Sequence, residues 1–178
     1  GSWVGLNRRF NGLGIQFKGR GELGATPFDW VAGFDKDASG EQRQGGATVA
    51  GQKTGRPTRD EWNQASNQDF FVQANWYIAE RWTLTTGVRN SRVDLTSRDD
   101  YLSDGSDGSG SVRYKATSPV LGLTWHVTDR WNLYANQGKG FETPTLAEAA
   151  YSSSGGTLSG SFNPALKAAT SLHQEIGT

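Results

Sequence analysis

Two similar stretches, WYIAERWTLTTG (residues 76–87) and WHVTDRWNLYAN (residues 125–136), decide the fold class of this chain. In each stretch two tryptophans flank a short acidic–basic pair, and alternating apolar and polar residues follow the second tryptophan. Side chains of a β-strand point alternately to its two faces. Each stretch therefore predicts two antiparallel strands, apolar on one face and polar on the other, joined by a tight turn at 79–81 or 128–130.

The same alternation with a period of two residues runs through much of the chain, and it predicts an all-β fold of about seven antiparallel up-and-down strands. Further alternating runs include 12–18 and 30–35. The residues expected on the apolar face are Trp76, Trp82, Leu84, Val88, Leu121, Leu123, Trp125, Trp131 and Leu133. The residues expected on the opposite face are Thr85, Thr124, Asn132 and Asn136.

The connections between these runs alternate in length. A third short turn is expected at 23–27, whereas long, polar connections are expected at 36–65, 98–111 and 143–170. Short turns at one end and long loops at the other are typical of an outer-membrane β-barrel, and tryptophans beside the short turns suit a membrane–water interface. The predicted aromatic girdle against outer-membrane lipid consists of Trp30, Trp76, Trp82, Trp125 and Trp131.

A soluble alternative remains open at this point, because sandwiches and lipocalin-like barrels also alternate, with the apolar side chains pointing inward. The composition favours the membrane barrel, since only 34% of the residues are hydrophobic while 11% are aromatic and 24 are glycine. The formal net charge of +0 and the lack of a basic stripe between aromatics argue against nucleic acid as a partner. With no cysteine, the chain has no disulfide, thiolate nucleophile or cysteine metal site.

Candidate catalytic residues are not evident. The two histidines, His126 and His173, are expected on different strands, and the serines and aspartates of 103–111 are typical of a solvated loop. The stretch 35–40 resembles the start of a calcium-binding loop, but Gly46 occupies the position that requires a bidentate glutamate. We therefore expect no enzyme activity, no catalytic residue, no cofactor and no metal site.

A group of cations has two open interpretations. It consists of Arg89, Arg92, Arg98, Arg113 and Lys115, on the outer halves of two neighbouring strands. Arg89, Arg113 and Lys115 are candidates to face an anionic ligand. Alternatively, the cations pair with Asp94, Asp99 and Asp100 or with lipopolysaccharide phosphates, as charge runs on solvated faces usually do.

The C-terminal part carries a more specific pattern. GKGFETPTLAEAAY (138–151), followed by FNPALKAATSLHQEIG (162–177), resembles the TonB-dependent outer-membrane receptors, and the similarity extends over nearly the whole chain. The matching residues are Gly140, Phe141, Pro144, Leu146, Glu148, Asn163, Pro164, Leu166, Lys167, Ser171, Glu175 and Gly177. The chain departs from the pattern at 168–170, where Ala-Ala-Thr stands in place of the usual Pro-Glu-x.

This resemblance implies a transmembrane β-barrel of about 22 strands, plugged by an N-terminal domain, in the outer membrane of a Gram-negative bacterium. It also implies uptake of a large, scarce ligand, foremost a ferric siderophore, with energy supplied through TonB. Residues 1–178 would form part of that barrel, without the plug. The isolated segment is then expected to self-associate through its open edges. The alternative is a small soluble or surface β-barrel or sandwich that binds a ligand without transporting it.

Overall fold

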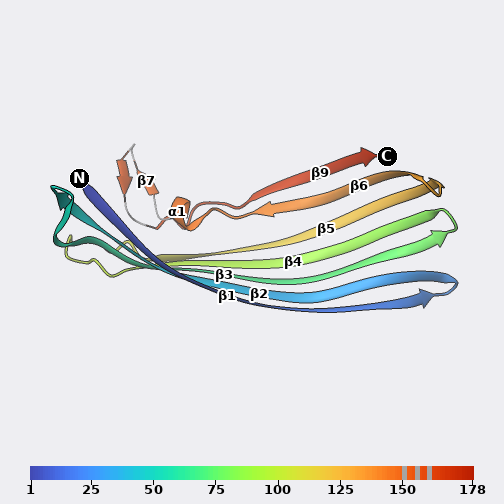
Figure 1. Ribbon diagram of the computed structural model, residues 1–178, viewed down its shortest axis with the longest axis horizontal. Coiled ribbons are helices and arrows are strands. Elements are labelled where there is room, and N and C mark those ends of the chain that lie inside the picture. The colour runs from blue at the N-terminus through green and yellow to red at the C-terminus, as the bar shows by residue number, and fades with distance from the viewer. Residues whose placement is uncertain (150–151, 155–156, 160–161) are drawn as a thin grey trace.

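The computed structural model of the chain is dominated by one antiparallel sheet, and it describes residues 1–149, 152–154, 157–159 and 162–178. Seven strands pair in the order β1-β2-β3-β4-β5-β6-β9 (Figure 1). Their bounds are β1 Ser2–Leu23, β2 Thr26–Val49, β3 Gln52–Ala79, β4 Trp82–Asp99, β5 Gly110–Thr128, β6 Trp131–Glu142 and β9 Ala169–Gly177. Between β6 and β9 lie the short helix α1 (Leu146–Ala149) and a small hairpin of β7 (Ser152–Ser154) and β8 (Thr157–Ser159).

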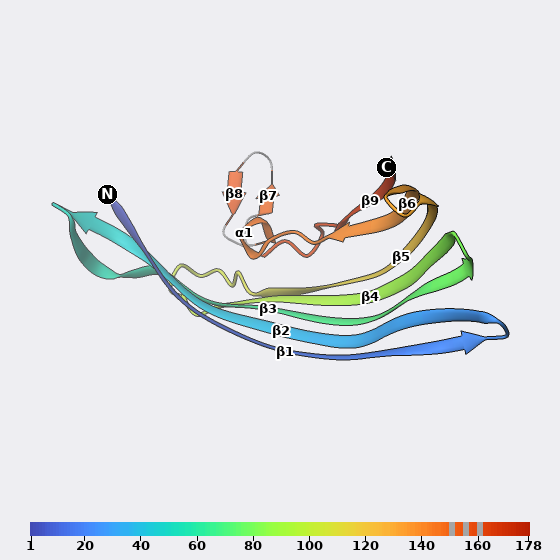
Figure 2. The same cartoon turned by 45° about the vertical axis from the view of Figure 1, so that its right-hand side comes forward.

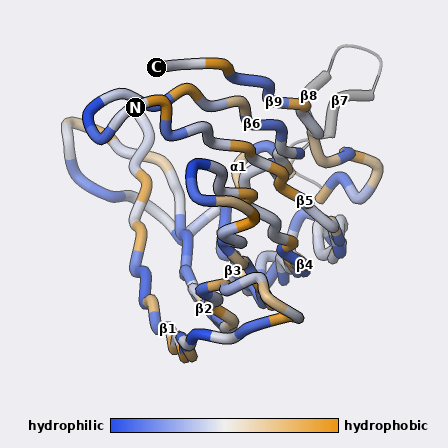
Figure 3. Tube along the Cα trace, turned by 90° about the vertical axis from the view of Figure 1, so that its right-hand side faces the viewer, coloured by the Kyte–Doolittle hydropathy of each residue, from blue (hydrophilic) through white to orange (hydrophobic). Residues whose placement is uncertain are grey.

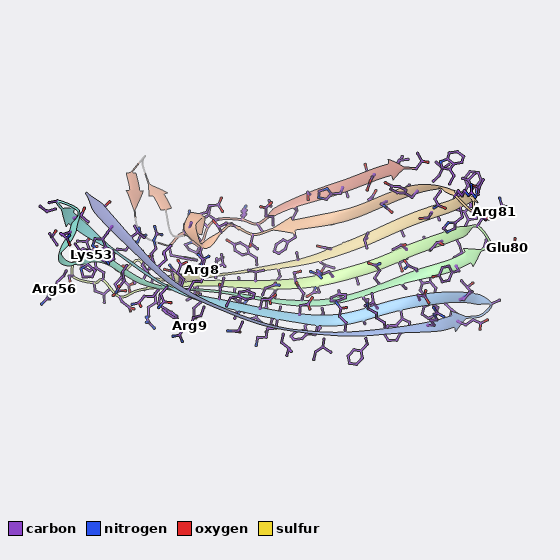
Figure 4. All side chains as sticks on the ribbon, in the orientation of Figure 1. Arg8, Arg9, Lys53, Arg56, Glu80 and Arg81 are labelled. Atoms are coloured by element: carbon purple, nitrogen blue, oxygen red, sulfur yellow. The ribbon has the colours of Figure 1, made fainter. Side chains whose placement is uncertain are left out.

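The up-and-down topology and its three short turns are as predicted. The turns that join β1 to β2, β3 to β4 and β5 to β6 all lie at one end of the sheet (Figure 1). Figure 4 places Glu80 and Arg81 at this end and Lys53 and Arg56 at the opposite end. Within the part of the chain that the structure describes, no helix is long and apolar enough to cross a membrane.

The predicted long loop at 36–65 is wrong. β2 and β3 continue through this region and meet in a tight turn at Ala50 and Gly51, whose φ angles are 51° and 79°. The strands lose their apolar alternation here, but their backbones remain paired in register. Polar side chains also bond between the two strands, since Gln42 and Gln44 both donate to Asp60. Both faces of this hairpin carry mainly polar side chains, so there is no apolar alternation for periodicity to reveal.

The other two long connections agree better with expectation. The connection between β4 and β5 spans 100–109, inside the predicted 98–111. The predicted connection 143–170 contains α1, β7 and β8, and its residues 150–151, 155–156 and 160–161 lie outside the described residues.

The register confirms both predicted faces, because directly paired residues of neighbouring strands share a face. Trp76, Leu84 and Leu123 form one row across β3, β4 and β5. The same face carries the other members of the predicted apolar set: Trp82, Val88, Leu121, Trp125, Trp131 and Leu133. The opposite face carries the predicted polar set: Thr85, Thr124, Asn132 and Asn136.

The sheet curves into an open arc, visible from the side in Figure 2 and along the strands in Figure 3. The segment with α1 lies within the arc, so the polar face is concave and the apolar face convex. The convex face remains exposed, with Leu121 56% accessible. In the described residues no second sheet packs on it, which argues against the soluble sandwich.

Candidate functional site on the concave face

The centre of the concave face is a charged cluster formed by three strands. Asp35 of β2 and Asp69 of β3 are direct cross-strand partners, and Arg89 of β4 lies beside both carboxylates. The Arg89 guanidinium donates to Asp69 Oδ2 at 3.2 Å and lies 3.9 Å from Asp35 Oδ2. It also stacks over the ring of Phe71, 5.2 Å from its centroid. One arginine thus lies between two facing carboxylates and reduces the repulsion between them.

Gly33 makes this arrangement possible. It is the cross-strand partner of Phe71, and a Cβ atom at position 33 would lie 2.6 Å from Phe71 Cζ and 2.8 Å from the backbone oxygen of Ile15. Only glycine leaves room for the Phe71 ring to lie against β2 and support Arg89 from below.

A second group of charges lies nearer the long-loop end. Arg8 of β1 donates through Nε to Glu41 Oε2 at 2.8 Å, and Asn63 Nδ2 donates to Glu61 Oε2 at 3.4 Å. Glu61 also accepts from Arg59. Glu41 and Glu61 are only 8% and 6% exposed, so these partners offset the desolvation of their carboxylates.

The segment that follows β6 folds back over the concave face, beginning with a capping box. The Thr145 backbone nitrogen and hydroxyl donate to Glu148 Oε2 at 2.7 and 2.9 Å, and the Glu148 backbone nitrogen donates to Thr145 Oγ1 at 3.2 Å. The hydrogen bond from the Thr145 backbone nitrogen has the largest effect on the Glu148 carboxyl, followed by the bond from the Thr145 hydroxyl. Both hold the pKa of this carboxyl below its ordinary value. They fix the single turn of α1 directly after Pro144.

An apolar cluster then attaches this covering segment to the sheet. It consists of Leu95 and Tyr114 on the sheet with Ala149 and Phe162 on the segment, and Leu166 packs against it. The Tyr114 hydroxyl donates to the Leu166 backbone oxygen at 2.9 Å.

Two cavities remain between sheet and segment. One has a volume of about 560 Å³ and lies between Arg8, Glu41 and Asn63 on the sheet and the chain at 143–147. The other has a volume of about 380 Å³ and is lined by the Asp69–Arg89 pair together with 139–143 residues such as Phe141. Both cavities combine charged and apolar walls, as ligand sites commonly do.

The residues of the sequence pattern prove to be mainly structural in this arrangement. Glu148 closes the capping box, while Phe141 and Leu146 pack against the apolar cluster. Asn163 Oδ1 accepts from the Ala165 backbone nitrogen at 3.0 Å, which shapes the turn containing Pro164. Lys167 is exposed.

The pattern residues of β9 fit against β6. Gly140 is the cross-strand partner of Ser171, and a Cβ atom at 140 would lie 2.9 Å from His173 Nε2. Glu175 Oε1 accepts from the Tyr134 hydroxyl at 2.8 Å, and Gly177 lies against the Tyr134 ring.

The three candidate ligand-facing cations do not lie together. Arg89 is on the concave face, whereas Arg113 and Lys115 are on the convex face, where they pair with Asp94 and Arg92 in register. Arg113 and Arg92 both donate to Asp94, and Arg98 donates to Asp100, as the pairing interpretation proposed.

The predicted girdle residues gather at the short-turn end of the convex face. Trp82 and Trp125 stack with ring centroids 5.5 Å apart, and Trp76 Nε1 donates to Thr86 Oγ1 at 2.9 Å. Trp131 donates to Thr178, and Trp30 covers Gly19. Their role at a lipid interface remains a prediction.

The histidines lie on different strands, β5 and β9, as expected. His126 contacts Thr83 and Asn132, while His173 Nε2 lies 2.8 Å from Ser171 Oγ. No group of three potential metal ligands occurs among the described residues.

Sequence reasoning missed the Asp35–Arg89–Asp69 cluster, because its members are far apart in the chain and have no common motif. The Thr145-x-x-Glu148 capping box carried a readable signal, since Thr followed three residues later by Glu is a helix-start pattern. Nothing local indicated the bond between Tyr114 and Leu166.

Comparison with known proteins places this geometry in a family. A family model described as "TonB dependent receptor-like, beta-barrel" matches residues 2–178. Similar solved structures include the ferric preacinetobactin receptor BauA from Acinetobacter baumannii, with a TM-score of 0.67 and 20% identity over 98% of this chain and 27% of that one. The unliganded ferric citrate transporter FecA gives a TM-score of 0.63 and 23% identity over 79% of this chain and 21% of that one.

A third similar structure is the ferric yersiniabactin uptake receptor FyuA from Yersinia pestis, with a TM-score of 0.56 and 13% identity over 98% of this chain and 26% of that one. At these identities the likeness concerns the fold. The chain spans between 21% and 27% of the lengths of these receptors.

Proposed function

The chain belongs to the TonB-dependent receptor-like β-barrel family, and on that premise we propose that it forms part of an outer-membrane receptor that takes up ferric siderophores. In this proposal residues 1–178 are one arc of a barrel of about 22 strands. Other strands close the barrel, a separate domain plugs it, and TonB supplies the energy. The location is the outer membrane of a Gram-negative bacterium.

The observation that carries the proposal is the division of the sheet into an exposed apolar convex face and a charged concave face. From Trp82 to Arg92, β4 rises about 33 Å along the strand, and a strand tilt of about 40° reduces this to about 25 Å along the membrane normal. That height equals the apolar band of outer-membrane barrels, which is about 25 Å. The convex face therefore suits lipid, and the concave face becomes the barrel lumen.

Unpaired buried acceptors support a further segment inside the lumen. Asn63 Oδ1 and Asp69 Oδ1 are buried and have no hydrogen-bond donor among the described residues. A buried acceptor without a donor costs about 1–3 kcal/mol. Each of these residues lines one of the two cavities, so donors from a plug domain or a ligand would relieve both.

The ligand class is inferred from chemistry and from the family. BauA, FecA and FyuA are described as receptors or transporters of ferric chelates. Ferric siderophores are large and carry oxygen-rich, often anionic surfaces, which suit a lumen that offers both arginine donors and apolar walls. We assign no enzymatic role to this chain.

The direct test is iron uptake by the full-length receptor. A deletion strain should lose growth on at least one ferric siderophore of a panel under iron limitation, and the intact gene should restore it. Growth on every chelate without the receptor, or restoration independent of TonB, would refute the proposal.

Arg89→Gln tests the lumen specifically, with Arg113→Gln on the convex face as its matched control. The first variant should weaken uptake or chelate binding by at least about tenfold, because a hydrogen bond to a charged group is worth about 1.5–3 kcal/mol. The control should leave uptake unchanged. Equal effects of the two variants would contradict the lumen assignment.

We also propose that the segment cannot remain monomeric in water on its own. β1 and β9 each leave one edge of the sheet unpaired, and the convex face is apolar. Light scattering without detergent should show association, whereas a stable monomer would argue for a self-contained binding domain.

A further inference from the structure

A row of basic side chains crosses the convex face directly where its apolar part ends. The register aligns Lys36, Gln68, Arg92 and Lys115 across β2, β3, β4 and β5. Arg113 lies in the next row towards the long-loop end, opposite Asp94. We call Lys36, Arg92, Arg113 and Lys115 the basic belt.

The charge of the basic belt is largely uncompensated. Asp94 is the single carboxylate in these two rows on the described strands, and both of its oxygens already accept, one from Arg92 and one from Arg113. The structure records no ion pair for Lys36 or Lys115 among the described residues, and both side chains are exposed. Arg92 and Lys115 even face each other directly, an arrangement that destabilises a sheet unless an anion lies between them.

The row next to the belt marks the upper limit of the apolar band. There Phe34 packs on Phe70 with ring centroids 4.7 Å apart, and Asn90 donates to Thr117 at 3.1 Å. The belt lies two residues further along each strand, a rise of about 7 Å. Below this row the same face is apolar down to Trp82 and Trp125. Acyl chains on the apolar band would therefore place their anionic headgroups at the belt.

We propose that the basic belt binds the phosphate groups of an anionic lipid in the outer leaflet of the membrane, an inference that rests on the proposed outer-membrane location. Arginine offers phosphate a planar fork of donors, and lysine offers compact point charges. A lipid phosphate fits this surface better than a soluble anion does. The lipid would contact the basic belt through its phosphate and the adjoining apolar band through its acyl chains, whereas a soluble anion would contact the belt alone.

The test is binding of diphosphoryl lipid A to the full-length receptor in detergent, measured by native mass spectrometry. The variant is Lys36→Gln/Lys115→Gln, which spares the Asp94 ion pairs. The matched control is Lys18→Gln/Lys53→Gln, since Lys18 lies on the concave face and Lys53 stacks on Trp3 near the hairpin tip. The belt variant should bind about 30-fold more weakly, because each basic side chain near an anionic lipid surface strengthens binding about fivefold.

Lipid A without phosphates should bind the unmodified receptor at least as weakly as diphosphoryl lipid A binds the belt variant, because the variant keeps Arg92 and Arg113. Equal binding by the two variants, or equal binding of both lipids, would overturn the proposal. Competition by millimolar inorganic phosphate would overturn it in favour of a soluble-anion site.

Cell fractionation and siderophore uptake, measured on the same variants, separate this inference from the proposed function. The belt variant should still reach the outer membrane and transport. Absence of the unmodified receptor from the outer membrane would refute the proposed function, whatever lipid A does in detergent.

Discussion

Placing an arginine on the convex face should destabilise the receptor far more than placing one at the same depth on the concave face. Val88 and Val120 form a matched pair for this test. Val88 lies on the convex face, while Val120 is the concave-face partner of Gly87, next to Val88 in sequence. The two side chains have nearly equal exposure in the sheet, 39% and 37%, so only the surrounding medium distinguishes them.

The expected magnitude follows from the depth of Val88. It lies about 20 Å along β4 from Trp82, or about 15 Å along the membrane normal at a tilt of about 40°. In an apolar band of about 25 Å this is close to the midplane, where a lipid-facing arginine costs about 2–4 kcal/mol. The folding equilibrium of Val88→Arg should therefore fall by about 30- to 900-fold.

Val120→Arg should change stability by no more than about 0.5 kcal/mol, since a position that faces the lumen lets the longer side chain reach water. Both variants are made in the full-length receptor and unfolded with urea in lipid vesicles, with tryptophan fluorescence as the readout. Equal losses, or a larger loss for Val120→Arg, would show that the convex face does not contact lipid.

The remaining predictions concern the concave face and its covering segment. Thr145→Ala should weaken the α1 cap by about 1 kcal/mol and increase amide exchange at 146–149, while leaving exchange in the sheet unchanged. The pKa of the Glu148 carboxyl is lower in the folded protein, so the carboxylate should stabilise the cap fully above its ordinary pKa of 4.5. This stabilisation should be lost as the pH falls through the lower folded pKa, and the opening equilibrium of amides 146–149 should then increase. An opening equilibrium that does not change with pH in this range would contradict the assignment. Gly33→Ala should destabilise the receptor by about 1–3 kcal/mol, since its Cβ would overlap the Phe71 ring and a backbone oxygen, and a neutral effect in urea unfolding would refute the close approach.

Local pattern was sufficient for the antiparallel strand order, the short turns and the two faces. The alternation around Trp82 and Trp125 could be read directly, because each strand has one apolar face and neighbouring side chains in the sequence point to opposite sides. The polar hairpin of 36–65 was missed for the same reason, since its strands carry mainly polar side chains on both faces and offer no alternation to read.

The sequence by itself therefore determined an antiparallel sheet with one apolar face, and its C-terminal pattern indicated the receptor family. Only the tertiary structure decided which cations lie together, separating Arg89 from Arg113 and Lys115 and joining it to Asp35 and Asp69. It also decided that the capped α1 segment covers the concave face through Tyr114 and Leu166. The physical reason is that alternation is a property of neighbouring residues, whereas a charge cluster depends on the register between strands, which is set by contacts distant in the chain.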